Sequence, residues 1–175
     1  MSAVAPAQRW RENARLFEDE LRIGRVWQEW AAGELATHLR PLRVEIPDYE
    51  FRESIRDAGR FTAGDCDLTI RGTAVGDVVL EVKSRPVYFG DAASYPYPTA
   101  LIDTVDGWEA KRIEPRAVLL VSRTARRILV VPTATKPRWQ VAQRRDGVRG
   151  TWDRVYEIDR RLLQSFAWLV NKLRP

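Results

Sequence analysis

One β-hairpin, formed by residues 67–70 and 79–83, constrains the fold of this chain more than any other feature. The second segment alternates apolar and charged residues, so Glu81 and Lys83 point to one face of the strand and Leu80 points to the other. Strict alternation of this kind is typical of a strand with one face in the core. The sequence therefore predicts a half-buried hairpin that carries a charged face.

The pairing of the two strands follows from a turn centred on Ala74, which lies between two glycines. This register places Leu68 opposite Leu80 and Asp67 opposite Glu81, and a shift by one residue would mix the apolar and acidic faces. Facing side chains lie about 4.5–5.5 Å apart at Cβ, where two carboxylates repel each other. Hard divalent cations bind carboxylate oxygens, so a cation between the two acids would relieve that repulsion.

Three segments carry a family resemblance: Gly64-Asp-Cys-Asp67-Leu, Glu81-Val-Lys83-Ser-Arg, and a downstream run that ends in Lys111-Arg-Ile. Together they resemble the PD-(D/E)XK nuclease superfamily, the restriction-endonuclease-like fold that includes Holliday-junction resolvases and many phage nucleases. The resemblance extends from about Gly24 to Val131, and its motifs are short. It implies an α/β fold with an αβββαβ core, in which helices flank a mixed central sheet, with extra N- and C-terminal helices.

The resemblance also assigns roles on the acidic face. Asp67 and Glu81 would hold Mg²⁺ or Mn²⁺, and the Val82 carbonyl oxygen would add a ligand. Lys83 would position or activate the attacking water. Because an unperturbed lysine has a pKa near 10.4, we expect Lys83 to orient the water unless its pKa is depressed.

The first helix is expected to supply a further site residue. In the resembled family an acid or glutamine often follows a glycine of this helix by four residues, and counting from Gly24 gives Gln28, with Glu29 beside it. A buried amide needs a hydrogen-bond partner, so Gln28 is either a site residue or a cap on nearby backbone. Glu29 is the alternative if the helix is rotated. Asp65, two residues before Asp67, is another candidate ligand.

Two basic regions are candidates for contacts with a nucleic acid. Lys111 and Arg112 match a resolvase-like pattern in which a lysine approaches the scissile phosphate, although an exposed helical position is the alternative. The tract 136–154 combines arginines with Trp139 and Trp152, which suits phosphate contacts and stacking on unpaired bases, but also suits a solvated hairpin face. The arginines expected to contact phosphates are Arg144, Arg145 and Arg149, with Arg138 and Arg154 nearby.

Apolar periodicity and turn residues predict the other elements. They are a helix over 8–39, a strand over 42–46, a loop over 84–99, a short helix capped by Asp103 or Thr104 and reaching about 113, buried strands over 117–121 and 128–131, a basic ribbon over 136–154, and a last helix from about 159. We expect the short helix to be a crossover. No linker divides the chain, so we expect one domain over residues 1–175, with a core at about 20–132, a basic insert at about 136–157 and a C-terminal helix at about 159–173.

Composition agrees with an intracellular enzyme. The chain has 29 basic and 24 acidic residues, a net charge of +5, which has the right sign for binding phosphates but is modest. Its single cysteine excludes an internal disulfide and fits the reducing cytosol. No apolar run approaches the length of a membrane span. We therefore expect a cytoplasmic protein that does not contact membranes.

The expected function is a Mg²⁺- or Mn²⁺-dependent deoxyribonuclease, of endo- or exonuclease type, from a phage, a mobile element or a DNA-repair system. Its expected partner is DNA, and the resemblance suggests a homodimer. Two alternatives stay open. One is a catalytically silent nucleic-acid-binding module with the same fold, and the other is an assembly protein that uses its basic face for protein partners.

Overall fold

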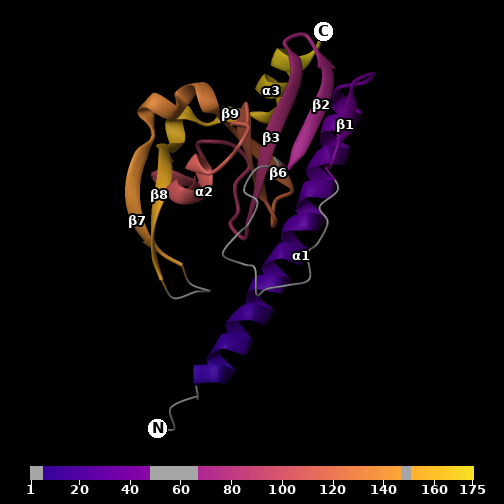
Figure 1. Cartoon of the computed structure of the whole chain (residues 1–175). Coiled ribbons are helices and arrows are strands. Elements are labelled where there is room, and N and C mark those ends of the chain that lie inside the picture. Colours follow the sequence, from indigo (N-terminus) through magenta and orange to yellow (C-terminus); the bar gives the residue numbers. More distant parts are fainter. Residues whose placement is uncertain (1–5, 48–66, 147–150) are drawn as a thin grey trace.

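The computed structural model describes residues 6–47, 67–146 and 151–175, with side chains from residue 18 onward. Figure 1 shows the arrangement of its elements. The helices are α1 (Pro6–His38), α2 (Val105–Glu109) and α3 (Phe166–Leu173), with 3-10 turns η2 (Thr133–Arg138) and η3 (Arg160–Leu162). The strands are β1 (Arg43–Glu45), β2 (Leu68–Thr73), β3 (Gly76–Arg85), β4 (Thr99–Thr104), β5 (Ala117–Ser122), β6 (Arg127–Pro132), β7 (Gln140–Arg145), β8 (Trp152–Asp159) and β9 (Gln164–Ser165).

The strands form two sheets. The larger has six strands in the order β1-β2-β3-β5-β6-β9, and the smaller has three in the order β4-β8-β7. In the larger sheet β3 and β5 are parallel and every other neighbouring pair is antiparallel. Parallel neighbours need a crossover connection, which here contains β4 and α2. The predicted α/β fold with a mixed central sheet is confirmed.

The predicted hairpin has the expected register. Leu68 faces Leu80, and Ile70 faces Val78 in the same pairing. The register shifts between Ile70 and Thr73, so the turn itself is irregular. Gly72 (φ 75°) adopts a positive φ there, a conformation that glycine reaches without a steric penalty. The hairpin therefore keeps its apolar residues on one face, as the alternation predicts.

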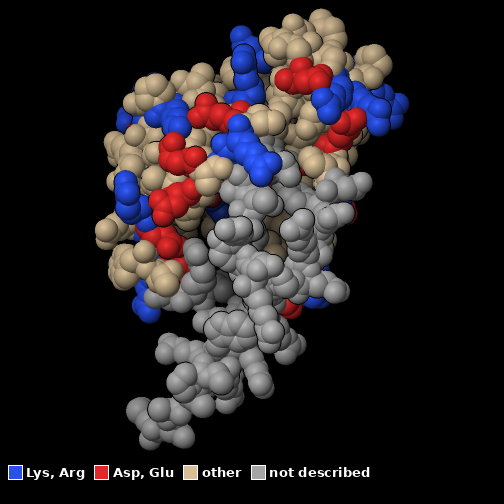
Figure 2. Space-filling model, viewed as in Figure 1, with Lys and Arg blue, Asp and Glu red and all other residues tan. Residues whose placement is uncertain are grey.

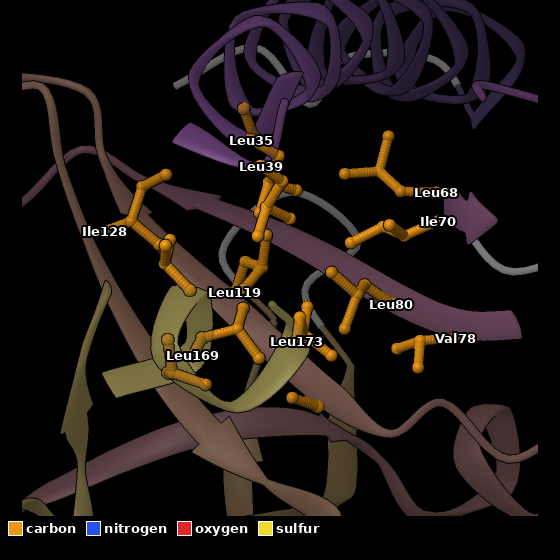
Figure 3. Packing of buried hydrophobic residues seen from close by; sticks show 14 of the residues in the cluster. Leu35, Leu39, Leu68, Ile70, Val78, Leu80, Leu119, Ile128, Leu169 and Leu173 are labelled. Atoms are coloured by element: carbon orange, nitrogen blue, oxygen red, sulfur yellow. The ribbon is translucent and has the colours of Figure 1, made fainter. Parts of the chain in front are cut away.

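The two faces of the six-stranded sheet are covered differently. One face packs against α1 and α3, through residues such as Leu35, Leu119 and Leu173 (Figure 3). The other face packs against the three-stranded sheet and α2, where Val118 of β5 belongs to the same buried cluster as Ile158 of β8. Every residue of β5 is buried, as expected for a central strand covered on both sides.

The expectation that helices cover both faces is therefore wrong for the second face. The segment Thr99–Thr104, where the sequence predicts the end of a loop and the start of a helix, is strand β4. It pairs with β8, more than fifty positions further along the chain, and such pairing leaves little local signal. The basic insert is confirmed as a ribbon, β7 paired with β8, and this ribbon supplies the rest of the second sheet.

Two helix boundaries also differ from the prediction. Helix α2 begins after Thr104, whose Oγ1 accepts a hydrogen bond from the Gly107 amide, but it ends at Glu109 instead of near residue 113. The last helix begins at Phe166 instead of about 159, because β8 continues to Asp159. The Asp159 carboxylate does cap a turn, but that turn is the short η3. Ser165 caps α3 through the Trp168 amide.

Candidate active site

Five charged side chains from four places in the chain gather at one edge of the space between the two sheets. Asp67 directly precedes β2, Glu81 and Lys83 lie on β3, Asp103 lies near the end of β4, and Lys111 follows α2. On β3 the residues paired with Val118 and Leu120 of β5 are Glu81 and Lys83, and residues paired across two strands project to the same face. The charged face of the hairpin is therefore the face that the second sheet covers.

Asp67 lies beside Glu81, as the hairpin register predicts. The backbone amide of Val82 donates a hydrogen bond of 2.7 Å to Asp67 Oδ2. Burial is the largest cause that raises the pKa of Asp67 and the neighbouring Glu81 carboxylate is the second, so this pKa reaches about 6 although the Val82 hydrogen bond and the nearby lysines lower it. The repulsion between the two acids, inferred from spacing alone, is thus present in the folded protein.

Glu81 and Asp103 alternate with the two lysines in a closed ring of ion pairs. Lys83 Nζ lies 2.8 Å from Glu81 Oε1 and 3.1 Å from Asp103 Oδ2. Lys111 Nζ lies 3.0 Å from Glu81 Oε2 and 3.6 Å from the same Asp103 oxygen. Only 5% of Glu81 is exposed, and a buried charge is stable only when it is paired. The ring supplies that pairing.

Lys83 is held in its charged form. Burial alone would lower the pKa of Lys83, but the nearby Glu81 and Asp103 carboxylates outweigh burial and raise this pKa above its ordinary value. An ammonium group with a raised pKa is a poor general base at neutral pH. At neutral pH the Lys83 ammonium group is therefore a hydrogen-bond donor and not a proton acceptor.

Gln28, and not Glu29, contacts the site. Gln28 lies on the buried side of α1, and its Nε2 donates a hydrogen bond of 2.5 Å to the backbone carbonyl of Asp67. Glu29 is exposed and pairs with Arg25 at 3.0 Å. Because the Gln28 amide binds main chain instead of a carboxylate, its role here is to position the segment that carries Asp67.

The donor set of the cluster fits a hard divalent cation in chemistry. Asp67 and Glu81 offer carboxylate oxygens on adjacent strands, the ligand type that Mg²⁺ and Mn²⁺ prefer. With Asp103, three carboxylates stand against two ammonium groups, so the fully ionised cluster has an excess of one negative charge. Each Glu81 oxygen is paired with one lysine, so a cation would bind the remaining lone pairs of these oxygens or replace a lysine.

Among the side chains that the structure describes, in residues 18–47, 67–146 and 151–175, no three of histidine, cysteine or acidic type are grouped as a ready metal site. A cation held by Asp67, Glu81 and the Val82 carbonyl would use two side chains and one backbone oxygen. Asp65, the further candidate ligand, lies outside the described residues. Lys111 was predicted on a helix, and instead it follows α2 and reaches the cluster from the loop.

The predicted basic residues fall into different environments. Arg112 and Arg145 are exposed, whereas Arg144 pairs with the buried Glu157. Arg149 lies outside the described residues. Trp139 is buried and its ring packs edge-on against Trp108 at 4.9 Å, so it belongs to the core and does not present a face for stacking. Lys and Arg side chains are interspersed with Asp and Glu over the described surface visible in Figure 2.

Asp103 is the site residue that sequence reasoning missed. The sequence pattern indicates Asp103 only as a helix cap, and its Oδ1 does accept a hydrogen bond from the Thr104 amide. Its other oxygen faces the lysines because β4 pairs with β8 and aligns Asp103 opposite Tyr156. The alternation of Ala100 and Ile102, both buried, was a local signal for a strand.

Comparison with known proteins gives no relative from which a role for these residues could be taken. No family model matches the chain, and no curated protein or solved structure is significantly similar to it. None of the described helices combines the length and the apolar character that a membrane span requires.

Proposed function

We propose that this chain is a divalent-metal-dependent deoxyribonuclease of the PD-(D/E)XK type, which hydrolyses phosphodiester bonds and leaves 5′-phosphate and 3′-hydroxyl ends. The observation that carries the proposal is the convergence of Asp67, Glu81 and Lys83 on one partly buried face, with the pKa of Asp67 raised by burial and by Glu81. Like charges held together at a protected site are a frequent mark of function.

The topology supports the same proposal. Strands β1, β2 and β3 form an antiparallel meander after α1, and β3 is followed through a crossover by the parallel strand β5. This order corresponds to the αβββαβ core that the resemblance implies, with α2 as the second helix and β4 added to the crossover. Asp67 and Glu81 then occupy the hairpin positions that the resemblance assigns to metal ligands.

In the proposed enzyme Asp67, Glu81 and the Val82 carbonyl would hold Mg²⁺ or Mn²⁺. A bound divalent cation supplies Lewis acidity toward a phosphate and lowers the pKa of its water ligand. Lys83, kept protonated by its carboxylate neighbours, would donate hydrogen bonds to the attacking water or to a phosphate oxygen. It would act as an orienting group and not as a base.

Asp103 and Lys111 extend the motif. Because Asp103 Oδ2 contacts both lysines, it remains a partner for them when Glu81 turns toward a cation. Lys111, with only 13% of its side chain exposed, adds a second ammonium group where the scissile phosphate would lie. Asp103 is thus a positioning residue, and Lys111 is a candidate contact for the phosphate.

The alternative is a catalytically silent nucleic-acid-binding module. It is favoured by one observation: the ring already pairs both oxygens of Glu81 with lysines, so the ring alone can stabilise the buried charges. In that case Lys83 and Glu81 would stabilise the junction of the two sheets and no cation would bind.

Cleavage assays separate the two functions. The wild-type protein is incubated with supercoiled, branched and single-stranded DNA, with Mg²⁺ or Mn²⁺ and with EDTA. We expect cleavage that needs the metal and that disappears in Glu81→Gln. Asp77→Asn is the matched control, because Asp77 is an exposed acid on the same strand, paired with Arg71. DNA binding without cleavage under every condition would support the silent module.

A further inference from the structure

Strands β7 and β8 form a two-stranded ribbon whose two faces differ in charge. They pair without a register shift from Gln140 opposite Glu157 to Arg145 opposite Trp152, so the side chains alternate strictly between two faces. One face presents Val141, Gln143, Arg145, Trp152, Arg154 and Tyr156. The opposite face presents Gln140, Ala142, Arg144, Asp153, Val155 and Glu157.

On the face that carries Arg144, an acid pairs with the arginine, whereas the face that carries Arg145 and Arg154 has no acidic residue. Arg144 donates two hydrogen bonds to the buried Glu157 carboxylate, so the charge of this arginine is neutralised within the protein. On the first face Arg145 and Arg154 are both exposed, and the six residues of that face include no carboxylate. We call Gln143, Arg145, Trp152 and Arg154 the ribbon face.

Trp152 is the most unusual member of the ribbon face. It is 69% exposed, whereas Trp108 and Trp139, which belong to the cluster between the two sheets, are buried. An indole left in water at the end of a ribbon adds little to the core. A large flat ring flanked by arginines is the combination that binds unpaired bases, since the ring stacks on the base and the cations pair with phosphates.

The ribbon face points to the same side of its sheet as the candidate active site. Asp103 pairs directly with Tyr156 across β4 and β8, so the two side chains share a face, and Tyr156 shares that face with Arg154 and Trp152. Arg154 acts electrostatically on the Tyr156 hydroxyl, which agrees with this orientation. Trp152 lies four residues beyond Tyr156, about 13 Å along the strand. Figure 1 shows the β7–β8 ribbon projecting beyond the body of the two sheets.

From this arrangement we infer that the ribbon face binds a single-stranded segment of the DNA substrate, with Trp152 stacked on an unpaired base and Arg145 and Arg154 on the adjoining phosphates. The inference rests on the proposed nuclease function and specifies its substrate. A span of about 13 Å corresponds to about four stacked nucleotides at 3.4 Å each. The preferred substrate would therefore carry an unpaired stretch, a tail or a branch, a few nucleotides from the cleaved bond.

The test is binding of wild-type protein in EDTA, where metal-dependent cleavage is absent, to three labelled DNAs: a blunt duplex, the same duplex with a single-stranded tail, and the single strand alone. We expect tighter binding to the tailed duplex than to the blunt one. Trp152→Ala should weaken binding to the tailed duplex and the single strand about tenfold and change blunt-duplex binding less than about twofold. Trp152→Phe, which keeps an aromatic ring, should retain most of the affinity.

The arginines give a second readout. Arg145→Ala and Arg154→Ala should each weaken binding and reduce the slope of log affinity against log salt concentration by about one. Arg43→Ala is the matched control, because Arg43 is a highly exposed arginine on the edge strand β1 of the other sheet. The inference is overturned if Trp152→Ala affects blunt and tailed DNA equally, if it affects neither, or if the protein binds none of the three DNAs.

Failure of the inference and failure of the proposed function give different results. Metal-dependent cleavage by wild-type protein, without a preference for tails that depends on Trp152, overturns the ribbon-face inference alone. A Trp152-dependent preference for tails, without cleavage under any metal condition, overturns the nuclease proposal and leaves the ribbon face as a single-strand binding surface.

Discussion

Two buried glutamates, Glu81 and Glu157, show how differently this protein treats buried charge. Their exposed fractions are nearly equal, at 5% and 6%. Arg144 binds Glu157 with two hydrogen bonds and the Thr99 hydroxyl adds a third, at 2.9 Å. The hydrogen bonds from Arg144 lower the pKa of Glu157 more than burial raises it. The Glu157 carboxylate is therefore paired with a single cation, the Arg144 guanidinium, and its charge is balanced.

The environment of Glu81 is not balanced in this way. Two lysines bind its oxygens, but Asp67 and Asp103 crowd the same space, and Asp67 has its pKa raised to about 6 by burial and by Glu81. A carboxyl group that is costly to ionise in the folded state is a liability for stability alone. The comparison teaches that the Glu157 pair serves the fold, whereas the Glu81 cluster stores an electrostatic cost that a bound cation would remove.

The largest expected difference between the Glu81 cluster and the Glu157 pair is in the rate of DNA cleavage. Lys83→Ala should reduce metal-dependent cleavage about a hundred- to a thousandfold, because a charged hydrogen-bond donor at the reacting group is lost. Lys172→Ala is the matched control, since Lys172 is an exposed lysine on α3. The measurement is the single-turnover cleavage rate at saturating protein. Unchanged cleavage by Lys83→Ala would show that Lys83 stabilises the fold through its ion pairs and does not act in cleavage.

A smaller catalytic effect is expected at Asp103. Asp103→Asn removes the carboxylate that both lysines share with Glu81, and we expect the cleavage rate to fall about tenfold because the lysines are less well positioned. Asp103→Glu should restore part of the rate. Both variants should bind metal-free DNA as tightly as the wild-type protein, and loss of that binding would contradict a positioning role.

Replacing Asp67 by a neutral residue should stabilise the protein, whereas replacing a well-paired buried acid destabilises it. With EDTA present at pH 8, Asp67→Asn should stabilise the protein by about 2 kcal/mol, because the variant no longer ionises a group whose pKa is raised. The folded pKa of about 6 lies above the ordinary 3.8, so the wild-type penalty is full above about pH 6 and vanishes below about pH 4. Urea unfolding at several pH values measures this, and a destabilised variant at pH 8 would contradict it.

The smallest effect is expected at the balanced pair. Glu157→Gln should destabilise the protein by about 1 kcal/mol near neutral pH, since charge-assisted hydrogen bonds are lost. The pKa of Glu157 is lowered below its ordinary 4.5, so this stabilisation is present above that pH and is lost as the pH falls through the folded pKa. The same unfolding series should therefore show opposite pH trends for Glu157→Gln and Asp67→Asn. Parallel trends would break the comparison.

The local part of the fold could be predicted from the sequence. The alternation in Val79–Lys83 and the position of the turn determine the register of β2 and β3, and that register alone brings Asp67 next to Glu81. Apolar continuity predicts β5 as a central strand for a similar reason, because both faces of a fully buried strand need apolar residues. Gln28 follows from the helical stripe, and its buried amide does find a partner.

The rest depended on contacts between distant segments. The pairing of β4 with β8 joins residues more than fifty positions apart, so local alternation can indicate a strand at Ala100–Ile102 but cannot indicate its partner or the placement of Asp103 beside the lysines. The same is true of Arg144, which was expected to bind phosphate and instead pairs with Glu157. Trp139 and Trp152 look alike in the basic tract, and only the tertiary structure separates the buried ring from the exposed one.

Direct titration of Mn²⁺ into the wild-type protein, Glu81→Gln and Glu157→Gln by calorimetry is the most direct test of whether the Glu81 cluster is a cation site. We expect one binding event in the wild-type protein and in Glu157→Gln, and none in Glu81→Gln, with circular dichroism confirming that all three proteins are folded. Equal binding of Mn²⁺ by all three proteins, or no binding by the wild-type protein, would show that the acids and lysines at this edge of the two sheets only stabilise the fold.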